Sequence, residues 1–119
     1  MKLGEIVDIL HAEVVLNNGD NEPDVVMAYG SDLMSDVLTF AKPGAILLTG
    51  LTTPQAIFTA EMADVGVVCF VRGKRPPEDT VRLAQSKNMV LLRTDLSMFE
   101  SCGRLYEHGL RGSLEHEER

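Results

Sequence analysis

Two apolar runs separated by a segment that reads as a helix, within residues 45–74, constrain the fold more than any other feature of this chain. The runs cover residues 45–48 and 65–71, and Pro54 introduces a segment predicted to be helical over 55–64. Nearly continuous apolar runs joined by a helix are typical of neighbouring parallel strands that are covered on both faces. This unit predicts an α/β fold.

The rest of the sequence repeats the alternation of helices and strands. Apolar periodicity and turn residues predict further helices over 2–10, from Ser31 or Asp32 to Phe40, over 78–87, and from Thr94 or Asp95 to the glycines at 109 and 112, with strands at 12–16, 25–29 and 89–93. We therefore expect a single compact α/β domain over residues 1–112, with a mainly parallel sheet and helices on both faces. Residues 113–119 are predicted to be a disordered, charged tail.

Composition is that of an ordinary soluble domain, with 119 residues, 45% hydrophobic and 24% charged. No apolar run approaches the roughly 20 residues that a membrane-spanning helix needs. The first five residues contain Glu5 and do not resemble a signal peptide. The expectation is a cytoplasmic protein with no membrane partner.

Charge is distributed unevenly along the chain. The net charge of −7 argues against general nucleic-acid binding, which depends on neutralising phosphates. Acidic residues dominate positions 1–36, where Lys2 is the single basic residue, whereas basic residues outnumber acidic ones between positions 72 and 111. The basic part is compatible with an anion-attracting patch and equally with a solvated surface.

Cysteine and histidine give no sign of a metal site or a disulfide framework. The two cysteines, Cys69 and Cys102, lie in an apolar strand and on the apolar stripe of the last helix, which favours buried free thiols. The three histidines are not at ligand spacing. No cofactor is expected.

Helical periodicity and residue type also predict which side chains pack. The stripe of the last helix comprises Phe99, Cys102, Leu105 and Tyr106. The methionines at positions 27, 34, 62, 89 and 98 occupy core-like positions on separate elements.

Polar residues follow four of the predicted strands at the point where each strand ends. Because the carboxyl ends of parallel strands meet at one edge of a sheet, we expect these residues to gather there, next to helix amino termini that favour anions. The predicted ligand is a nucleotide or a phosphorylated metabolite. The candidate ligand-binding residues are Ser31, Asp32, Gly50, Thr52, Thr53, Arg72, Gly73, Lys74 and Thr94.

Simpler roles for the same residues stay open. Thr52 or Thr53 followed by Pro54 also fits an ordinary helix cap, and Ser31 or Asp32 fits another. The basic run at 72–75 is compatible with a phosphate, with the acidic third of a second copy, or with a solvated loop. The pattern lacks both a Walker loop and a Gly-x-Gly-x-x-Gly fingerprint, which argues against ordinary nucleoside triphosphate hydrolysis.

Four segments of the chain together form a distinctive set. They are Gly30-Ser31-Asp32-Leu33-Met34-Ser35-Asp36-Val37-Leu38, Gly50-Leu51-Thr52-Thr53-Pro54-Gln55, Phe70-Val71-Arg72-Gly73-Lys74 and Cys102-Gly103-Arg104-Leu105-Tyr106. This set resembles the DRTGG domain, a small module similar to the amino-terminal domain of HPr kinase, and the resemblance extends over residues 2–112. The string that names the family is absent: Leu51-Thr52-Thr53 falls where Asp-Arg-Thr would stand, and Arg72-Gly73 falls near the glycine pair.

This resemblance implies a non-enzymatic regulatory module that forms a homodimer and senses a small anionic ligand or docks on a partner enzyme. Two alternatives remain: a pure protein-interaction module without a small ligand, and an enzyme acting on a phosphorylated or acyl substrate with Asp32 or Asp95 as base. The second alternative lacks an activated nucleophile with a partnering base.

Overall fold

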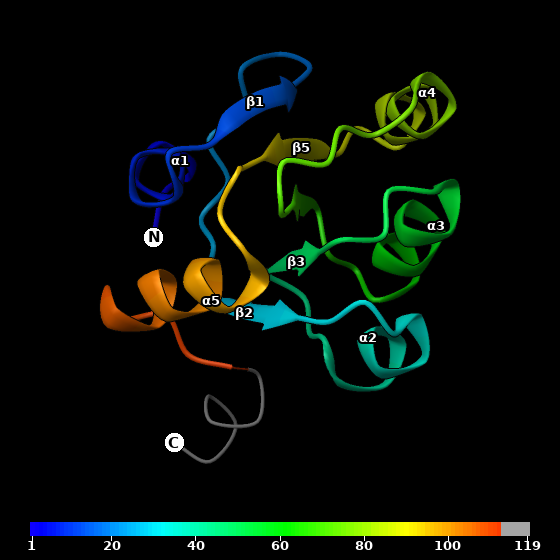
Figure 1. Cartoon of the computed structure of the whole chain (residues 1–119). Helices are drawn as coiled ribbons and strands as arrows, with labels where there is room; N and C mark the ends of the chain where they lie inside the picture. Colours follow the sequence, from blue (N-terminus) through cyan, green and yellow to red (C-terminus); the bar gives the residue numbers. More distant parts are fainter. Residues whose placement is uncertain (113–119) are drawn as a thin grey trace.

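The computed structural model describes residues 1–112 and shows one five-stranded sheet between two layers of helices (Figure 1). The strands lie in the order β1-β5-β4-β3-β2. The elements are α1 (Leu3–Leu10), β1 (Glu13–Leu16), β2 (Met27–Gly30), α2 (Met34–Phe40), β3 (Ala45–Thr49), α3 (Pro54–Met62), β4 (Val67–Phe70), α4 (Glu78–Ser86), β5 (Val90–Arg93) and α5 (Met98–Glu107).

Four of the strands are parallel, which confirms the predicted α/β class. β2, β3, β4 and β5 pair in parallel, whereas β1 runs antiparallel to β5 with an irregularity between Val14 and Leu16. The antiparallel strand stands at one edge of the sheet, and β2 stands at the other.

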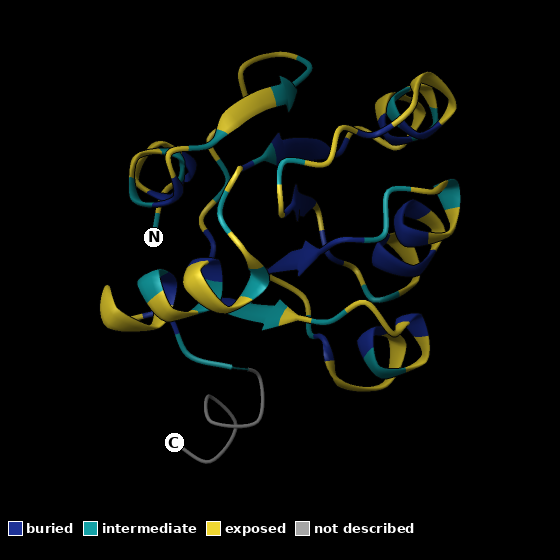
Figure 2. Cartoon of the chain, in the orientation of Figure 1, coloured by how far each residue is buried: buried dark blue, intermediate teal, exposed yellow. Residues whose placement is uncertain are grey.

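Helices cover both faces of the sheet, as predicted. α2, α3 and α4 pack on one face, and α1 and α5 pack on the other (Figure 1). Alternate residues of the central strands feed the two cores: Leu47 and Phe70 belong to the first, and Leu48 and Cys69 to the second. Figure 2 shows the central strands fully buried between the helices. Burial on both faces explains why these strands read as continuous apolar runs.

Several predicted boundaries and burials are wrong. α2 is preceded by Leu33 and α5 by Ser97, so both helices begin later than predicted. On α5, Phe99 is 86% exposed and Tyr106 is 50% exposed, so only part of the predicted apolar stripe is buried. Met62 is 68% exposed rather than in the core. The predicted disordered tail lies outside the described residues.

Thr94 connects the end of β5 to α1 through a buried hydroxyl. Its Oγ1 donates to the carbonyl of Leu10 at 2.7 Å and accepts from the amide of Leu96 at 3.2 Å. Replacing Thr94 by valine keeps the shape but leaves these groups unpaired, so we expect the free energy of unfolding to fall by about 1–3 kcal/mol. Urea denaturation measures the loss. Thr94→Ser, which keeps the hydroxyl, should recover most of it, and equal losses in the two variants would contradict the hydrogen-bond explanation.

Candidate anion-binding rim

The polar ends of the parallel strands meet at one edge of the sheet, as the sequence predicts. Gly30 is in register with Leu48, Thr49 with Phe70, and Phe70 with Arg93. The loops that follow these strands are therefore neighbours. We call them, at residues 31–33, 50–53, 71–77 and 94–97, the carboxyl rim.

Gly50 is the point at which three of the predicted residues come together. Asp32 Oδ1 accepts from the Gly50 amide at 2.6 Å, and Lys74 Nζ donates to the Gly50 carbonyl at 3.0 Å. Asp32 Oδ2 also lies 3.6 Å from Arg72 Nη2. The peptide groups of a buried glycine thus hold one carboxylate and one ammonium in fixed positions.

Gly50 leaves room for the end of the Arg72 side chain, which lies directly over it. A Cβ at Gly50 would stand 2.2 Å from Arg72 Nη2 and 3.3 Å from Asp32 Oδ1. Any larger residue at Gly50 displaces the guanidinium. The sequence motif Thr49-Gly50 therefore makes room for a cation as well as ending a strand.

Arg72 itself has an unusual backbone conformation. Its φ is 62° and that of Gly73 is 71°, so both residues are left-handed. The turn is fixed by the Arg72 amide, which donates to the Leu96 carbonyl at 2.8 Å, and by the Gly73 amide, which donates to the Thr94 carbonyl at 2.9 Å. A left-handed arginine is strained, and strain of this kind is concentrated at functional sites.

Carboxylates pair with most of the cations on this rim. Glu13 binds Arg75 at 3.1 Å and Arg93 at 3.4 Å, and Arg93 also binds Asp95 at 3.0 Å. The hydrogen bond from Arg75 lowers the pKa of Glu13, and the hydrogen bond with Glu13 raises the pKa of Arg75.

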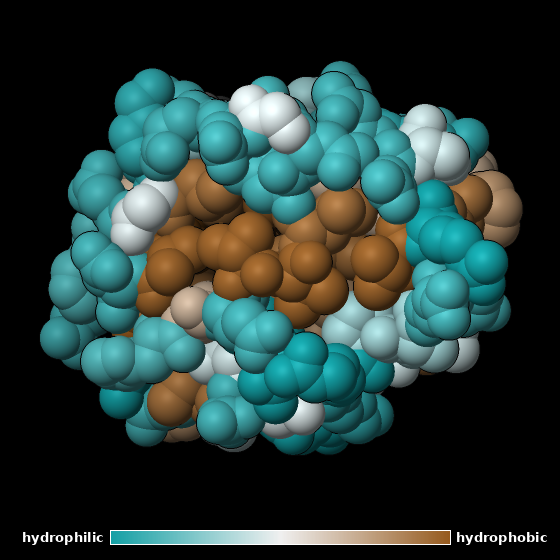
Figure 3. All heavy atoms as spheres, turned by 90° about the horizontal axis from the view of Figure 1, so that it is seen from above, coloured by the Kyte–Doolittle hydropathy of each residue, from teal (hydrophilic) through white to brown (hydrophobic). Residues whose placement is uncertain are grey.

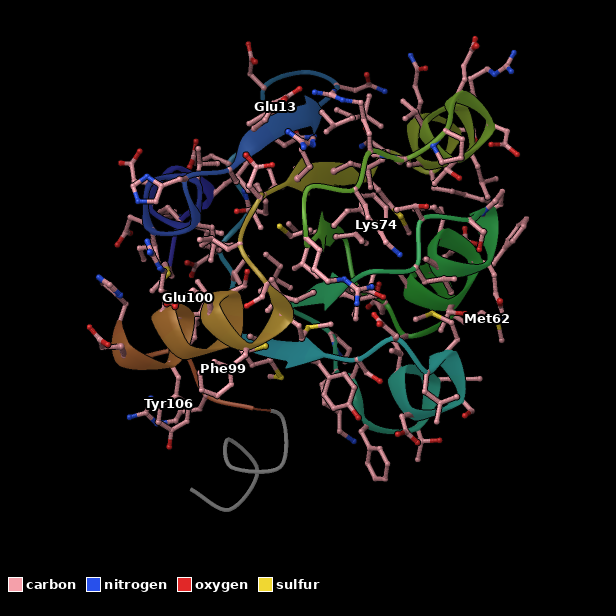
Figure 4. All side chains as sticks on the ribbon, viewed as in Figure 1. Glu13, Met62, Lys74, Phe99, Glu100 and Tyr106 are labelled. Carbon is pink, nitrogen blue, oxygen red and sulfur yellow. The ribbon has the colours of Figure 1, made fainter. Side chains whose placement is uncertain are left out.

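Lys74 is different. Within residues 1–112 no carboxylate lies within ion-pair distance of its ammonium group, and the residue is exposed on the loop after β4 (Figure 4). Together with Arg72, whose single contact to Asp32 is long and half exposed, Lys74 gives this part of the rim an excess of positive charge.

Three other predicted residues, Ser31, Thr52 and Thr53, lie in the loops before α2 and α3. Thr53 stands at the position before α3 with Pro54 in its first turn, but its side chain accepts no capping hydrogen bond. The carbonyl of Thr52 accepts from the buried Thr80 hydroxyl at 2.7 Å. Ser31 Oγ accepts from the Leu33 amide at 3.0 Å. Neither Ser31 nor Asp32 caps α2 as predicted, since the cap position is Leu33 and Asp32 is bound to Gly50.

Sequence reasoning missed three residues that shape the rim. Thr49 is buried, and its hydroxyl lies 3.3 Å from Asp32 Oδ1. Arg93 Nη2 donates to the Gly73 carbonyl at 2.8 Å, and Glu13 reaches the rim from the antiparallel strand β1. Arg93 is the last residue of the apolar strand β5, so its position at a strand end could have been noticed in the sequence, whereas Glu13 comes from a distant part of the chain.

The described residues offer no groups arranged for metal or thiol chemistry. Within residues 1–112 no group of three or more His, Cys, Asp and Glu side chains is placed to hold a metal ion.

Burial raises the pKa of Cys69 to about 12 and also raises that of Cys102. Of the described helices, none has the length and apolar character needed to cross a bilayer.

Both thiols are therefore expected to react slowly in the folded protein. The thiolate is the reactive form, and a raised pKa leaves it scarce at pH 8. We predict slow alkylation by iodoacetamide of the native chain and rapid alkylation once urea exposes Cys69, measured by intact mass. Rapid native labelling of Cys69 would contradict the burial described here.

No protein-family profile and no curated protein sequence matches the chain. Among solved structures, it is similar to the regulatory region of a Clostridium perfringens pyrophosphatase that contains CBS and DRTGG domains, with a TM-score of 0.68 and 20% identity. The two share a fold. The match covers 85% of this chain and 44% of that one, so the chain spans less than half of that regulatory region. The DRTGG-like fold expected from the sequence is thereby confirmed, and the pyrophosphatase region was solved in complex with its activator, diadenosine tetraphosphate.

Proposed function

We propose that this chain is a regulatory module that binds a small anionic ligand, a nucleotide or a phosphorylated metabolite, on the carboxyl rim. The observation that carries the proposal is the pair of cations beside Gly50, of which Lys74 has no carboxylate partner among the described residues. The fold shared with a regulatory region that binds a phosphate-rich activator supports the same class of ligand.

The weak ion pair between Asp32 and Arg72 allows a phosphate to replace the Asp32 carboxylate beside Arg72. Asp32 and Arg72 are 52% and 48% exposed, and an exposed ion pair at 3.6 Å contributes little stability. A phosphate can therefore replace Asp32 as the ion-pair partner of Arg72 with little loss of stability, and it can bind Lys74 at the same time. The exposed position of both cations leaves the phosphate free to carry a larger group outward.

Calorimetry and thermal shift against ATP, diadenosine tetraphosphate, inorganic pyrophosphate and a panel of phosphorylated metabolites test the proposal. A ligand at 100 times its dissociation constant should add about 2.7 kcal/mol to the free energy of unfolding. Binding should weaken as salt rises, because the contacts are ionic. No stabilisation by any phosphorylated compound would refute the proposal.

Asp32→Asn should separate the structural from the electrostatic role of this side chain. The amide keeps an oxygen for the Gly50 amide at the position of Oδ1 but removes the charge that competes for Arg72. We expect near-normal stability and roughly tenfold tighter phosphate binding, equivalent to about 1.4 kcal/mol. Asp32→Ala should instead lower stability by about 1–3 kcal/mol, because the buried Gly50 amide loses its acceptor. Weaker binding by Asp32→Asn would mean that Asp32 contacts the ligand directly.

A second candidate function is a protein-interaction module that forms a homodimer, and the exposed face of α5 favours it. Phe99 and Tyr106 project from the same side of this helix (Figure 4), and exposed aromatic side chains are enriched at protein interfaces. Phe99→Glu should convert a dimer to a monomer in sedimentation experiments while leaving the unfolding midpoint of the monomer unchanged. A wild-type chain that stays monomeric at high concentration would remove this candidate.

A further inference from the structure

A second surface, separate from the carboxyl rim, lies between α1, β1 and the loop that follows β1. It is a hollow of about 590 Å³. Figure 3 looks down on the β1 edge of the molecule and shows a hollowed hydrophobic strip between hydrophilic residues. The apolar residues that line the hollow are Leu3, Val7, Val14, Val15 and Leu16. Val14 is 46% exposed, so one of the apolar residues that line the hollow is accessible to a partner.

The charged residues that line the hollow are all acidic. They are Asp8, Asp20 and Glu22, and none of the lining residues is a lysine or an arginine. Within residues 1–112 none of these three carboxylates forms an ion pair. Glu22 Oε1 accepts from the Gly4 amide at 2.9 Å, which fixes its position beside α1 without neutralising it. The hollow therefore combines an apolar floor with negative walls.

One side of the β1 backbone, beside the hollow, has no partner strand among the described residues. β1 stands at the edge of the sheet, and within the described chain β5 is the only strand that pairs with it. An open edge can add an extended segment through main-chain hydrogen bonds, while the side chains on the floor select apolar residues.

Charge distinguishes between the possible occupants. If two copies of this chain met edge to edge, the acidic walls of both hollows would be brought together, in a protein whose net charge is already −7. A segment with apolar and basic side chains avoids this repulsion and can pair with these three carboxylates, none of which forms an ion pair within residues 1–112. The electrostatics thus favour a basic partner over a second copy.

We propose that this hollow is a docking site for an extended segment of a partner protein in which basic and apolar side chains alternate, added to the sheet beside β1. Apolar side chains of the segment enter the hollow beside Val14, and the long, flexible stems of its basic side chains let their charges reach the carboxylates of the same hollow, Asp8, Asp20 and Glu22. Because β1 has only four residues, the match is short, and the ionic contacts supply much of the selectivity.

The test uses the full chain and a short synthetic peptide in which lysine and valine alternate, with binding followed by fluorescence anisotropy and by amide chemical shifts. We expect shifts at Val14 and Leu16, and weaker binding in high salt. The matched peptide with glutamate in place of lysine should bind at least roughly tenfold more weakly. A third peptide with proline at its centre should also lose binding, because proline removes a main-chain donor.

Variants of the chain complete the test. Asp20→Asn combined with Glu22→Gln should weaken binding of the lysine peptide while leaving phosphate binding at the rim and the unfolding midpoint unchanged. Equal binding of the lysine and glutamate peptides, or shifts confined to other surfaces, would overturn the proposal. Concentration-dependent shifts of Val14 in the chain alone would overturn it too, because they would assign this edge to a second copy.

Discussion

Replacing Phe70 by alanine is expected to lower the free energy of unfolding by about 3–5 kcal/mol, the largest effect of any single substitution considered for this chain. Phe70 is completely buried at the end of β4, in the core shared with α2, α3 and α4. Its removal leaves a cavity in a close-packed region that cannot collapse, because parallel strands flank it on both sides. For a domain whose total stability is about 5–15 kcal/mol, much of the margin is lost.

Guanidinium denaturation measures this loss, and Phe58 provides the control. Phe58 lies on α3 but is 49% exposed, so Phe58→Ala removes the same atoms without opening a core cavity. We expect that control to cost less than about 1 kcal/mol. Similar losses for the two alanine variants would contradict the burial of Phe70 in the core between the sheet and the helices α2, α3 and α4.

Removing both cations beside Gly50 is expected to weaken phosphate binding by roughly a hundredfold or more, equivalent to about 2.8 kcal/mol. In the variant Arg72→Ala with Lys74→Ala, each lost contact is a charge-assisted one. Stability should change little, because both side chains are exposed. Arg72→Ala still has to adopt the left-handed turn, so Arg72→Gly serves as a second variant that relieves this conformation.

The matched control is the double variant Arg82→Ala with Lys87→Ala, in which Arg82 lies on α4 and Lys87 directly follows it. It changes the net charge by the same amount but removes cations that pair with Glu78 and Glu61 instead of facing the rim. Calorimetric titration with the tightest phosphorylated ligand should give near-normal affinity for this control. An equal loss in both double variants would assign the effect to overall charge and not to a site.

The sequence was most informative about the sheet. Continuous apolar runs identified β3 and β4, and the predicted parallel arrangement of β2, β3 and β4 placed Asp32, Gly50 and Lys74 on one rim, where Asp32 and Lys74 both contact Gly50. These features depend on local pattern and on the rule that parallel strands end together.

What the sequence could not predict depends on contacts between distant segments. The helix predicted to start at Thr94 or Asp95 begins after Ser97, because the Thr94 side chain is held by α1 and the carbonyl of Leu96 accepts from the Arg72 amide. Phe99 fits the helical period of α5 but lies on the face turned away from the sheet. Period alone does not tell which side of a helix meets the core when apolar residues surround it.

Amide chemical shifts recorded during titration with ATP, inorganic pyrophosphate and the phosphorylated metabolites test the central claim most directly. The account predicts that the amides of Gly50, Arg72, Gly73 and Lys74 shift together and saturate with one dissociation constant, which the Arg72→Ala and Lys74→Ala double variant raises. Saturable shifts that leave these amides unmoved and appear elsewhere on the molecule would contradict it.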